Sequence, residues 1–162
     1  MQQYTDQVLN MSLRFTSTKG WCLHSDDIVN EGTFLFEYLG DLISTVEAKE
    51  RWKRQRILKS KNYIMSLKEH YGEDMTIVTR LDASEYGNIS RFVNHSCDAN
   101  CRIESVRVSG SMIPHLAFFT KRRIDAGEEL TVDYASSDST AGGGVECFCG
   151  SSGCRGTLPY EE

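Results

Sequence analysis

Short apolar runs separated by polar turns make up the hydrophobic pattern of this chain. A run at 33–43 is rich in aromatic residues and is broken by Gly40, so we predict a strand and a turn there. Five further runs have the length and the β-branched or aromatic content of strands: residues 63–67, 75–81, 102–108, 115–120 and 129–134. Short strands with irregular connections predict a mainly β fold with a small helical part.

One segment carries a helical signature. Ser44 and Glu47 form a capping-box pattern, which predicts a helix from about Thr45 to Lys59. Its apolar face is thin, so we expect the helix to lie on the surface; the face consists of Val46, Trp52 and Ile57.

Charge is distributed unevenly along the 162 residues, whose formal net charge is −5. The segment 49–61 holds seven of the 18 basic residues, while the rest of the chain has twice as many acidic as basic residues. An acidic body favours a basic peptide as partner, and the basic segment could contact DNA phosphates. The same segment is equally typical of a solvated helix face.

The chain shows no membrane or secretion signal. No apolar run reaches eighteen residues, and the N-terminus lacks the basic and then apolar layout of a secretory signal. We therefore expect an intracellular protein without a membrane span.

Three of the six cysteines lie within eight residues of the C-terminal tail, where Cys147, Cys149 and Cys154 have the spacing C-x-C-x4-C. Clustered thiols in an intracellular chain indicate a metal more than disulfides. A tetrahedral zinc site needs a fourth ligand, and the tail offers no other cysteine or histidine. Cys97 and Cys101 are the candidates from the body. The alternative is three free thiols on a loose tail.

A glycine-rich polar segment, 136–144, separates the body from this tail and is typical of a flexible linker. The tail is too short to form a core unaided, so it needs a metal and the body. We divide the chain into four parts: a cysteine-free flank (1–18), the body (19–135), the linker (136–146) and the zinc-binding tail (147–162).

Two polar strings lie inside the body, at 91–100 (RFVNHSCDAN) and 127–134 (GEELTVDY). Polar groups this dense are costly to bury unless they bond one another or a ligand. Taken alone, His95 would be interpreted as a hydrogen-bonded core histidine, and Tyr134 as an ordinary core residue.

Together and in this order, the two strings and the cysteine tail resemble the SET-domain family of lysine methyltransferases with its post-SET zinc tail. The resemblance runs from about Lys19 to Leu158 and includes the motifs at 19–21, 32–34 and 37–40. It implies the SET-domain β-clip fold, with small curved sheets and a threaded C-terminal segment. The region 106–119 looks most like the heterochromatin-type enzymes, which modify lysine nine of a histone tail.

The resemblance also implies a cofactor and a metal. S-adenosylmethionine would be bound by residues that match the family's motifs, namely Lys19, Gly20, Trp21, Tyr63, Arg91, Asn94 and His95, with Phe148 covering it. Cys97 corresponds to the family's fourth Zn²⁺ ligand, so the metal set would be Cys97, Cys147, Cys149 and Cys154. Cys22 and Cys101 are then expected to be small buried residues.

Tyr38 and Tyr134 match the tyrosines of the family's substrate channel, with Tyr134 in the catalytic position. A narrow aromatic channel disfavours the ammonium form of lysine and so aids formation of the nucleophilic amine. Val132 stands where the family usually has Phe or Tyr. Because valine is smaller, we predict a capacity for di- or trimethylation.

The expected function is therefore S-adenosylmethionine-dependent methylation of a histone-tail lysine, with lysine nine favoured. Two alternatives stay open: an inactive, zinc-stabilised module that binds peptides or chromatin, and a methyltransferase of another histone lysine or of a non-histone protein. We expect a nuclear, chromatin-associated monomer whose partners are histone tails and nucleosomes, with DNA contacts through residues 49–61.

Overall fold

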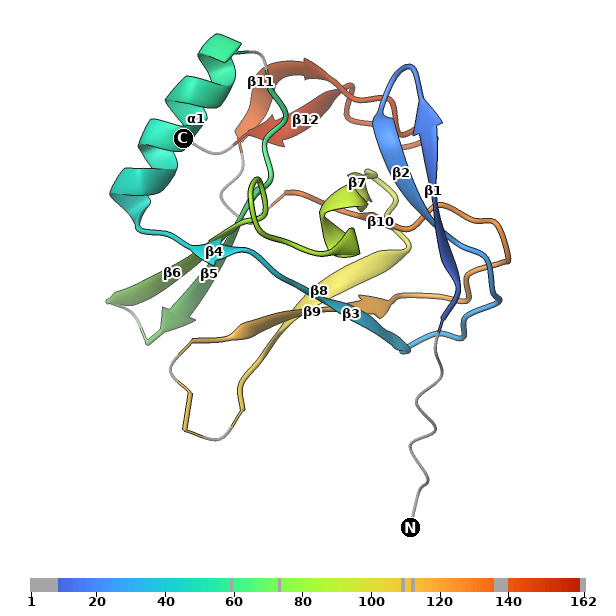
Figure 1. The fold of residues 1–162 in the computed structure, drawn as a ribbon, viewed down its shortest axis with the longest axis horizontal. Coiled ribbons are helices and arrows are strands. Elements are labelled where there is room, and N and C mark those ends of the chain that lie inside the picture. The colour runs from blue at the N-terminus through green and yellow to red at the C-terminus, as the bar shows by residue number, and fades with distance from the viewer. Residues whose placement is uncertain are drawn as a thin grey trace.

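The computed structural model describes residues 9–58, 60–72, 74–108, 110–111, 113–135 and 140–160. Small sheets and one α-helix make up this part of the chain (Figure 1). In chain order the elements are β1 (Met11–Thr16), β2 (Gly20–Ser25), β3 (Phe34–Tyr38), β4 (Asp41–Leu42), α1 (Thr45–Leu58), β5 (Ile64–Tyr71), β6 (Met75–Asp82), a 3-10 turn (Ile89–Phe92), β7 (Asn94–His95), β8 (Cys101–Val106), β9 (His115–Thr120), β10 (Thr131–Val132), β11 (Thr140–Glu146) and β12 (Thr157–Tyr160). The mainly β fold predicted from the sequence is confirmed. None of the helical segments described is long and apolar enough to cross a bilayer.

A five-stranded sheet with the order β3-β9-β8-β10-β7 forms the centre of the molecule. β3, β9 and β8 are antiparallel neighbours, whereas β10 runs parallel to both β8 and β7. The core packs on this sheet, where the Phe36 and Phe118 rings lie 5.1 Å apart. Its buried members include Leu23, Val29, Phe36, Tyr38, Leu116, Phe118, Ile124, Leu130 and Val132.

The buried amide of Asn100 holds the start of β10 between β8 and β7. Its Oδ1 accepts a hydrogen bond from the Thr131 backbone at 2.8 Å. Its Nδ2 donates to the Glu129 carbonyl and to Glu128 Oε1, both at 2.8 Å. Since Asn100 is only 2% exposed, these bonds satisfy polar groups that would otherwise be costly to bury. They bring the segment before Tyr134 against the Asn94–His95 strand.

α1 lies at one edge of the molecule, as its polar sequence predicted (Figure 1). The predicted cap is present, since the Glu47 backbone donates to Ser44 Oγ at 3.1 Å. The buried face differs from the predicted one, because Val46 and Ile57 are exposed and Ala48 is buried. Polar anchoring explains the difference, since Arg51 bonds the buried carboxylate of Asp82 at 2.7 Å.

The two ends of the described chain form hairpins of their own. β1 pairs with β2, so residues 11–16 of the predicted flank are part of the body. β11 pairs antiparallel with β12, so residues 140–146 form a strand where we predicted a flexible linker. The composition of 136–146 could not show this, because the pairing partner lies in the tail. Residues 136–139 and 1–8 lie outside the described residues.

Candidate functional site

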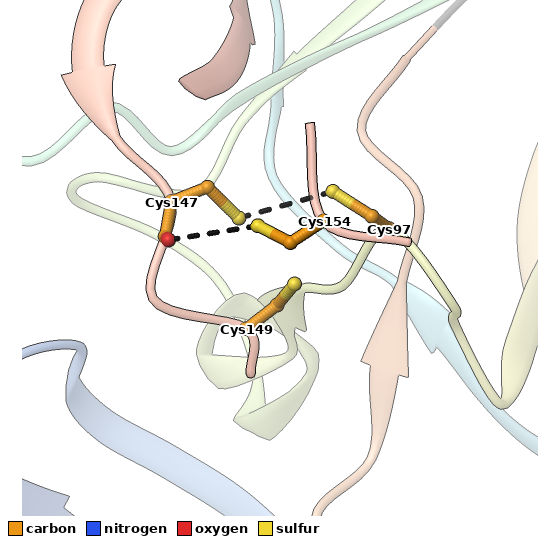
Figure 2. A group of neighbouring side chains, drawn as sticks. All are labelled: Cys97, Cys147, Cys149 and Cys154. Atoms are coloured by element: carbon orange, nitrogen blue, oxygen red, sulfur yellow. Dashed lines mark hydrogen bonds between the residues drawn. The ribbon is translucent and has the colours of Figure 1, made fainter. Parts of the chain in front are cut away.

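Four cysteine sulfurs lie together where the tail meets the body. Cys147, Cys149 and Cys154 lie beside Cys97, and all four Sγ atoms are within 4.8 Å of one another (Figure 2). Cys97 Sγ and Cys147 Sγ are 3.9 Å apart, and a tetrahedral zinc with bonds of about 2.3 Å needs sulfurs about 3.8 Å apart. The cluster could therefore hold a zinc ion.

Of the two candidates for the fourth ligand, the structure brings Cys97 to the cluster and leaves Cys101 outside it. Cys101 is 1% exposed, and burial raises the pKa of its thiol to about 12. Cys22 is also fully buried, beside the Thr16 hydroxyl. Both cysteines are small buried residues, as predicted.

The protein prepares part of the thiol cluster for the thiolate form. At Cys149 burial raises the pKa, but hydrogen bonding from Ser151 and from the Cys97 backbone outweighs it and lowers the pKa. Burial raises the pKa of Cys147, its neighbour in the cluster. Because zinc binds thiolates, a metal here would displace the proton of Cys147, while Cys149 is already disposed to be a thiolate.

His95 connects the cysteine cluster to Tyr134. Its Nδ1 accepts a hydrogen bond from the Tyr134 backbone at 3.1 Å, and its Nε2 lies 3.3 Å from Cys97 Sγ. Burial lowers the pKa of His95 and so favours the neutral ring. Since Nδ1 accepts from the Tyr134 backbone, a neutral ring would carry its proton on Nε2, beside Cys97 Sγ. His95 is thus a link between the cluster and the Tyr134 backbone.

The structure brings together the residues expected at the cofactor. Asn94 Nδ2 donates to the Trp21 carbonyl at 3.0 Å and to Glu129 Oε1 at 3.2 Å. The other Glu129 oxygen pairs with the Lys19 ammonium. One carboxylate therefore fixes Asn94 against the backbone of the 19–21 motif.

Arg91 and Tyr63 form a second wall of this region. The Arg91 guanidinium lies 4.1 Å from the centre of the Tyr63 ring, a cation–π arrangement. Arg91 Nε is buried and has no hydrogen-bond partner among the described residues. Gly20 has a φ of +79°, and a side chain there would meet Lys61. The unpaired donor of Arg91 fits a polar ligand such as the expected cofactor.

Tyr38 and Tyr134 lie close to Tyr63. The Tyr38 hydroxyl donates to the Tyr63 carbonyl at 2.6 Å, and the Tyr134 hydroxyl donates to the Val93 carbonyl at 2.7 Å. Burial and then the nearby Tyr134 raise the pKa of Tyr38. Although 44% of Tyr134 is exposed, removal of its hydroxyl from water and the neighbouring Tyr63 raise its pKa too. Both phenols therefore stay protonated at neutral pH.

The other predicted residues lie around this cluster. Val132 is buried in β10, opposite His95 in the strand register. Phe148 is exposed beside Cys147, and Leu158 in β12 is half-buried. A pocket of about 240 Å³ adjoins Tyr38 on another side, and its lining contains neither Val132 nor Tyr134.

Sequence reasoning missed two residues of this region, Arg155 and Glu129. The Arg155 backbone donates to Cys97 Sγ at 3.4 Å, and its guanidinium bonds Asp133. Glu129 connects Lys19 with Asn94 across more than a hundred residues of chain. The sequence offered one signal for both residues, which was their position in or beside a motif. Arg155 follows Cys154, and Glu129 lies within the 127–134 string.

Comparison with known proteins assigns the family. The SET domain model matches residues 20–135. The chain belongs to the SET-domain family. This match covers Asn94 and His95 of β7 and Tyr134 after β10, and it ends before the cysteine tail.

Relatives of this SET domain are named as histone-lysine methyltransferases. It is 37% identical to histone-lysine N-methyltransferase SUVR3 of Arabidopsis thaliana, over 97% of this chain and 48% of the relative. It is 42% identical to the probable histone-lysine N-methyltransferase set-23 of Caenorhabditis briggsae, over 89% of this chain and 58% of that relative. Su(var)3-9 of Drosophila melanogaster is 36% identical over 96% of this chain and 26% of its own length. The chain thus spans about half or less of the relatives it matches.

The fold of this SET domain matches solved structures. The methyltransferase domain of human histone-lysine N-methyltransferase SETMAR superposes with a TM-score of 0.81 and 29% identity, over 94% of this chain and 59% of that one. A second solved structure, from work on the product specificity of histone lysine methyltransferases, superposes with a TM-score of 0.77 and 30% identity. The match covers 93% of this chain and 57% of that one.

Proposed function

We propose that the chain carries the catalytic domain of an S-adenosylmethionine-dependent protein-lysine N-methyltransferase that acts on a histone tail, with lysine nine as the favoured target. The proposal rests mainly on one observation: Tyr38, Tyr63 and Tyr134 lie close to the unpaired Nε donor of Arg91. The names of the SET-domain relatives support the proposal.

The cofactor would lie against the 19–21 backbone, between Asn94 and the Arg91–Tyr63 pair. When bound, S-adenosylmethionine supplies a methyl group on a positively charged sulfur, an electrophilic carbon for an amine. Asn94 and the backbone of His95 offer donors and acceptors, while Phe148 would cover the site. The unpaired Nε of Arg91 supplies one further donor.

The tyrosines would prepare and orient the lysine. Lysine has a reference pKa of about 10.4, so the amine must lose its proton before it can act as a nucleophile. Surroundings that raise the pKa of Tyr38 and Tyr134 by burial also disfavour an ammonium. Each hydroxyl already donates to a backbone carbonyl, so its lone pairs are free to accept from the amine N–H groups. Positioning of this kind supplies most of the proposed rate enhancement.

Zinc bound by Cys97, Cys147, Cys149 and Cys154 would have a structural role. Four thiolates leave no open position for a substrate, so the metal would fix the tail against the body. His95 lies between Cys97 and Tyr134, so the position of the tail would affect the position of the catalytic tyrosine.

Buried Val132 leaves more room beside the lysine amine than the Phe or Tyr usual in the family. We include di- or trimethylation in the proposal for this reason. We also propose a nuclear, chromatin-associated location, because histones are found there. A monomeric state is part of the same proposal.

Calorimetry with S-adenosylmethionine, followed by transfer of radiolabelled methyl to histone peptides and nucleosomes, tests the proposal. We expect binding, and transfer that is strongest to peptides containing lysine nine. Binding without transfer to any lysine would favour the inactive peptide-binding module, against which the presence of Asn94, His95 and Tyr134 argues. Transfer to another histone lysine or to a non-histone protein would correct the target and keep the chemistry.

The exposed basic side of α1 supports a second proposal, contact with nucleosomal DNA. Lys53, Arg54 and Arg56 are exposed on this helix, whereas Arg51 turns to Asp82. Replacing these three exposed residues with glutamate should reduce methylation of nucleosomes and spare free peptide. Equal losses on both substrates would exclude the DNA contact.

A further inference from the structure

The ammonium group of Lys61 lies directly over Gly20. It donates a hydrogen bond to the Lys19 carbonyl at 3.0 Å, and a Cβ built on Gly20 would overlap its Nζ. Only a residue without a side chain leaves room for this approach, and the φ of +79° also favours glycine. Lys61 thereby reaches the wall proposed for the cofactor from the loop between α1 and β5.

The positive charge of Lys61 has no carboxylate partner among the residues that the structure describes. The nearby Lys19 differs, because Glu129 neutralises it. Like Lys61, Arg91 has no carboxylate partner among the described residues, but its guanidinium stacks on Tyr63. An ammonium has three N–H donors, and the Lys19 carbonyl takes one of those of Lys61. The site therefore presents an uncompensated charge with free donors at Gly20.

The charge distribution of S-adenosylmethionine determines which part can occupy that place. The molecule has one negative group, its α-carboxylate, and two positive groups, the sulfonium and the α-ammonium. Either positive group would be repelled by Lys61, whereas a carboxylate gains a charge-assisted hydrogen bond. The adenine ring is neutral and gains less.

We propose that Lys61 binds the α-carboxylate of S-adenosylmethionine and directs the amino-acid end of the cofactor toward Gly20. This inference rests on the proposed function, since it assumes that cofactor. It assigns to Lys61 a role in ligand specificity: the site selects adenosyl sulfonium compounds that carry a carboxylate. It also removes Lys61 from the basic segment available to DNA.

The test combines a residue change with a ligand change. Lys61→Met, Lys61→Arg and the control Lys53→Met would be titrated by calorimetry with S-adenosylmethionine and with its decarboxylated analogue. Lys53 is exposed on α1 and pairs with Glu50, so its loss removes a similar charge outside the site. Zinc content and the unfolding temperature would establish that each variant is folded.

For S-adenosylmethionine we expect about a tenfold rise in Kd with Lys61→Met, and less than about a threefold rise with Lys61→Arg. The decarboxylated analogue has only positive groups at that end, so it should bind Lys61→Met at least as tightly as the wild type. Lys53→Met should leave both Kd values unchanged.

Three outcomes overturn the inference in distinguishable ways. Unchanged affinity of Lys61→Met for S-adenosylmethionine removes Lys61 from the site and leaves the proposed function standing. An equal loss of affinity for both ligands shows that the Lys61 side chain supports the local fold and does not bind the carboxylate. Failure of the wild type to bind S-adenosylmethionine removes the proposed function together with this inference.

Discussion

Arg155 of the tail and Asp133 of the body form an ion pair at 2.6 Å, and Asp133 immediately precedes Tyr134. Burial raises the pKa of Asp133, but the hydrogen bonds from Arg155 and the Ala135 backbone, together with the charge of Arg155, outweigh it and lower that pKa. The same guanidinium lies 3.3 Å from His95 Nε2. The tail therefore contacts the Tyr134 segment through a side chain as well as through the cysteine cluster.

We predict that Arg155→Met lowers kcat about fivefold and leaves the zinc content unchanged. The pair is partly exposed, with 40% and 39% of its side chains accessible, so its loss costs about 1 kcal/mol of positioning. Zinc is retained because Arg155 supplies no ligand atom to the four-cysteine cluster. Arg155→Lys should recover part of the rate. Arg123→Met, which breaks the exposed pair with Asp125, is the matched control. An unchanged kcat would show that the cysteine cluster alone positions the tail.

Cys154→Ser should remove the zinc and most of the methyl transfer. Three thiolates bind zinc much more weakly than four, and the tail has no core of its own. Metal analysis and amide hydrogen exchange across residues 147–158 would measure the loss. Cys22→Ala removes a buried thiol outside the cluster and should keep the metal. Full zinc occupancy in Cys154→Ser would contradict the ligand set.

Val132→Tyr should shift the product toward monomethyl-lysine. Val132 is 4% exposed. If it borders the lysine amine as proposed, a larger ring would take up space there. Mass spectrometry of a peptide product under excess cofactor measures the methyl number. The wild type alone provides a second test, because a product that stops at one methyl group contradicts the interpretation of Val132.

Acid should destabilise the protein through Glu128. Burial raises the pKa of this carboxyl, but hydrogen bonds from Arg122 and Asn100 outweigh it and lower the pKa to about 2. Since the folded pKa is below the unfolded one, the stabilisation is present above about pH 4.5 and is lost as the pH falls toward 2. Glu128→Gln should cost up to about 3 kcal/mol at pH 7 and flatten the stability profile across that window. Denaturant unfolding at several pH values checks this, and parallel profiles for both proteins would refute it.

Local signals in the sequence were sufficient for several elements. The Ser44 cap placed the start of α1, and the apolar runs located β9, most of β6 and the first half of β5. The spacing of the tail cysteines predicted a metal cluster before any contact was known. These features depend on residues close together in the chain.

Contacts between distant segments could not be derived in this way. β11 lacks a strand pattern and is formed by pairing with β12. β1 alternates apolar and polar residues along MSLRFT, a strand signal that our prediction missed. β10 is shorter than the predicted 129–134 strand because Asn100 takes the backbone bonds at its start. The contacts of Lys61 and Arg155 join segments 42 and 22 residues apart. Only the resemblance to the SET-domain family placed Asn94, His95 and Tyr134 at one site.

The most direct test of the central claim is mass spectrometry of a histone-tail peptide containing lysine nine. The peptide would be incubated with S-adenosylmethionine and zinc-loaded protein, either wild type or Tyr134→Phe. We predict methyl groups on the lysine amine with the wild type, and a large loss of rate with Tyr134→Phe at unchanged affinity for the cofactor. Equal methylation by both proteins would contradict the role given to the Tyr134 hydroxyl, and no methylation by a wild type that binds the cofactor would contradict the activity on this substrate.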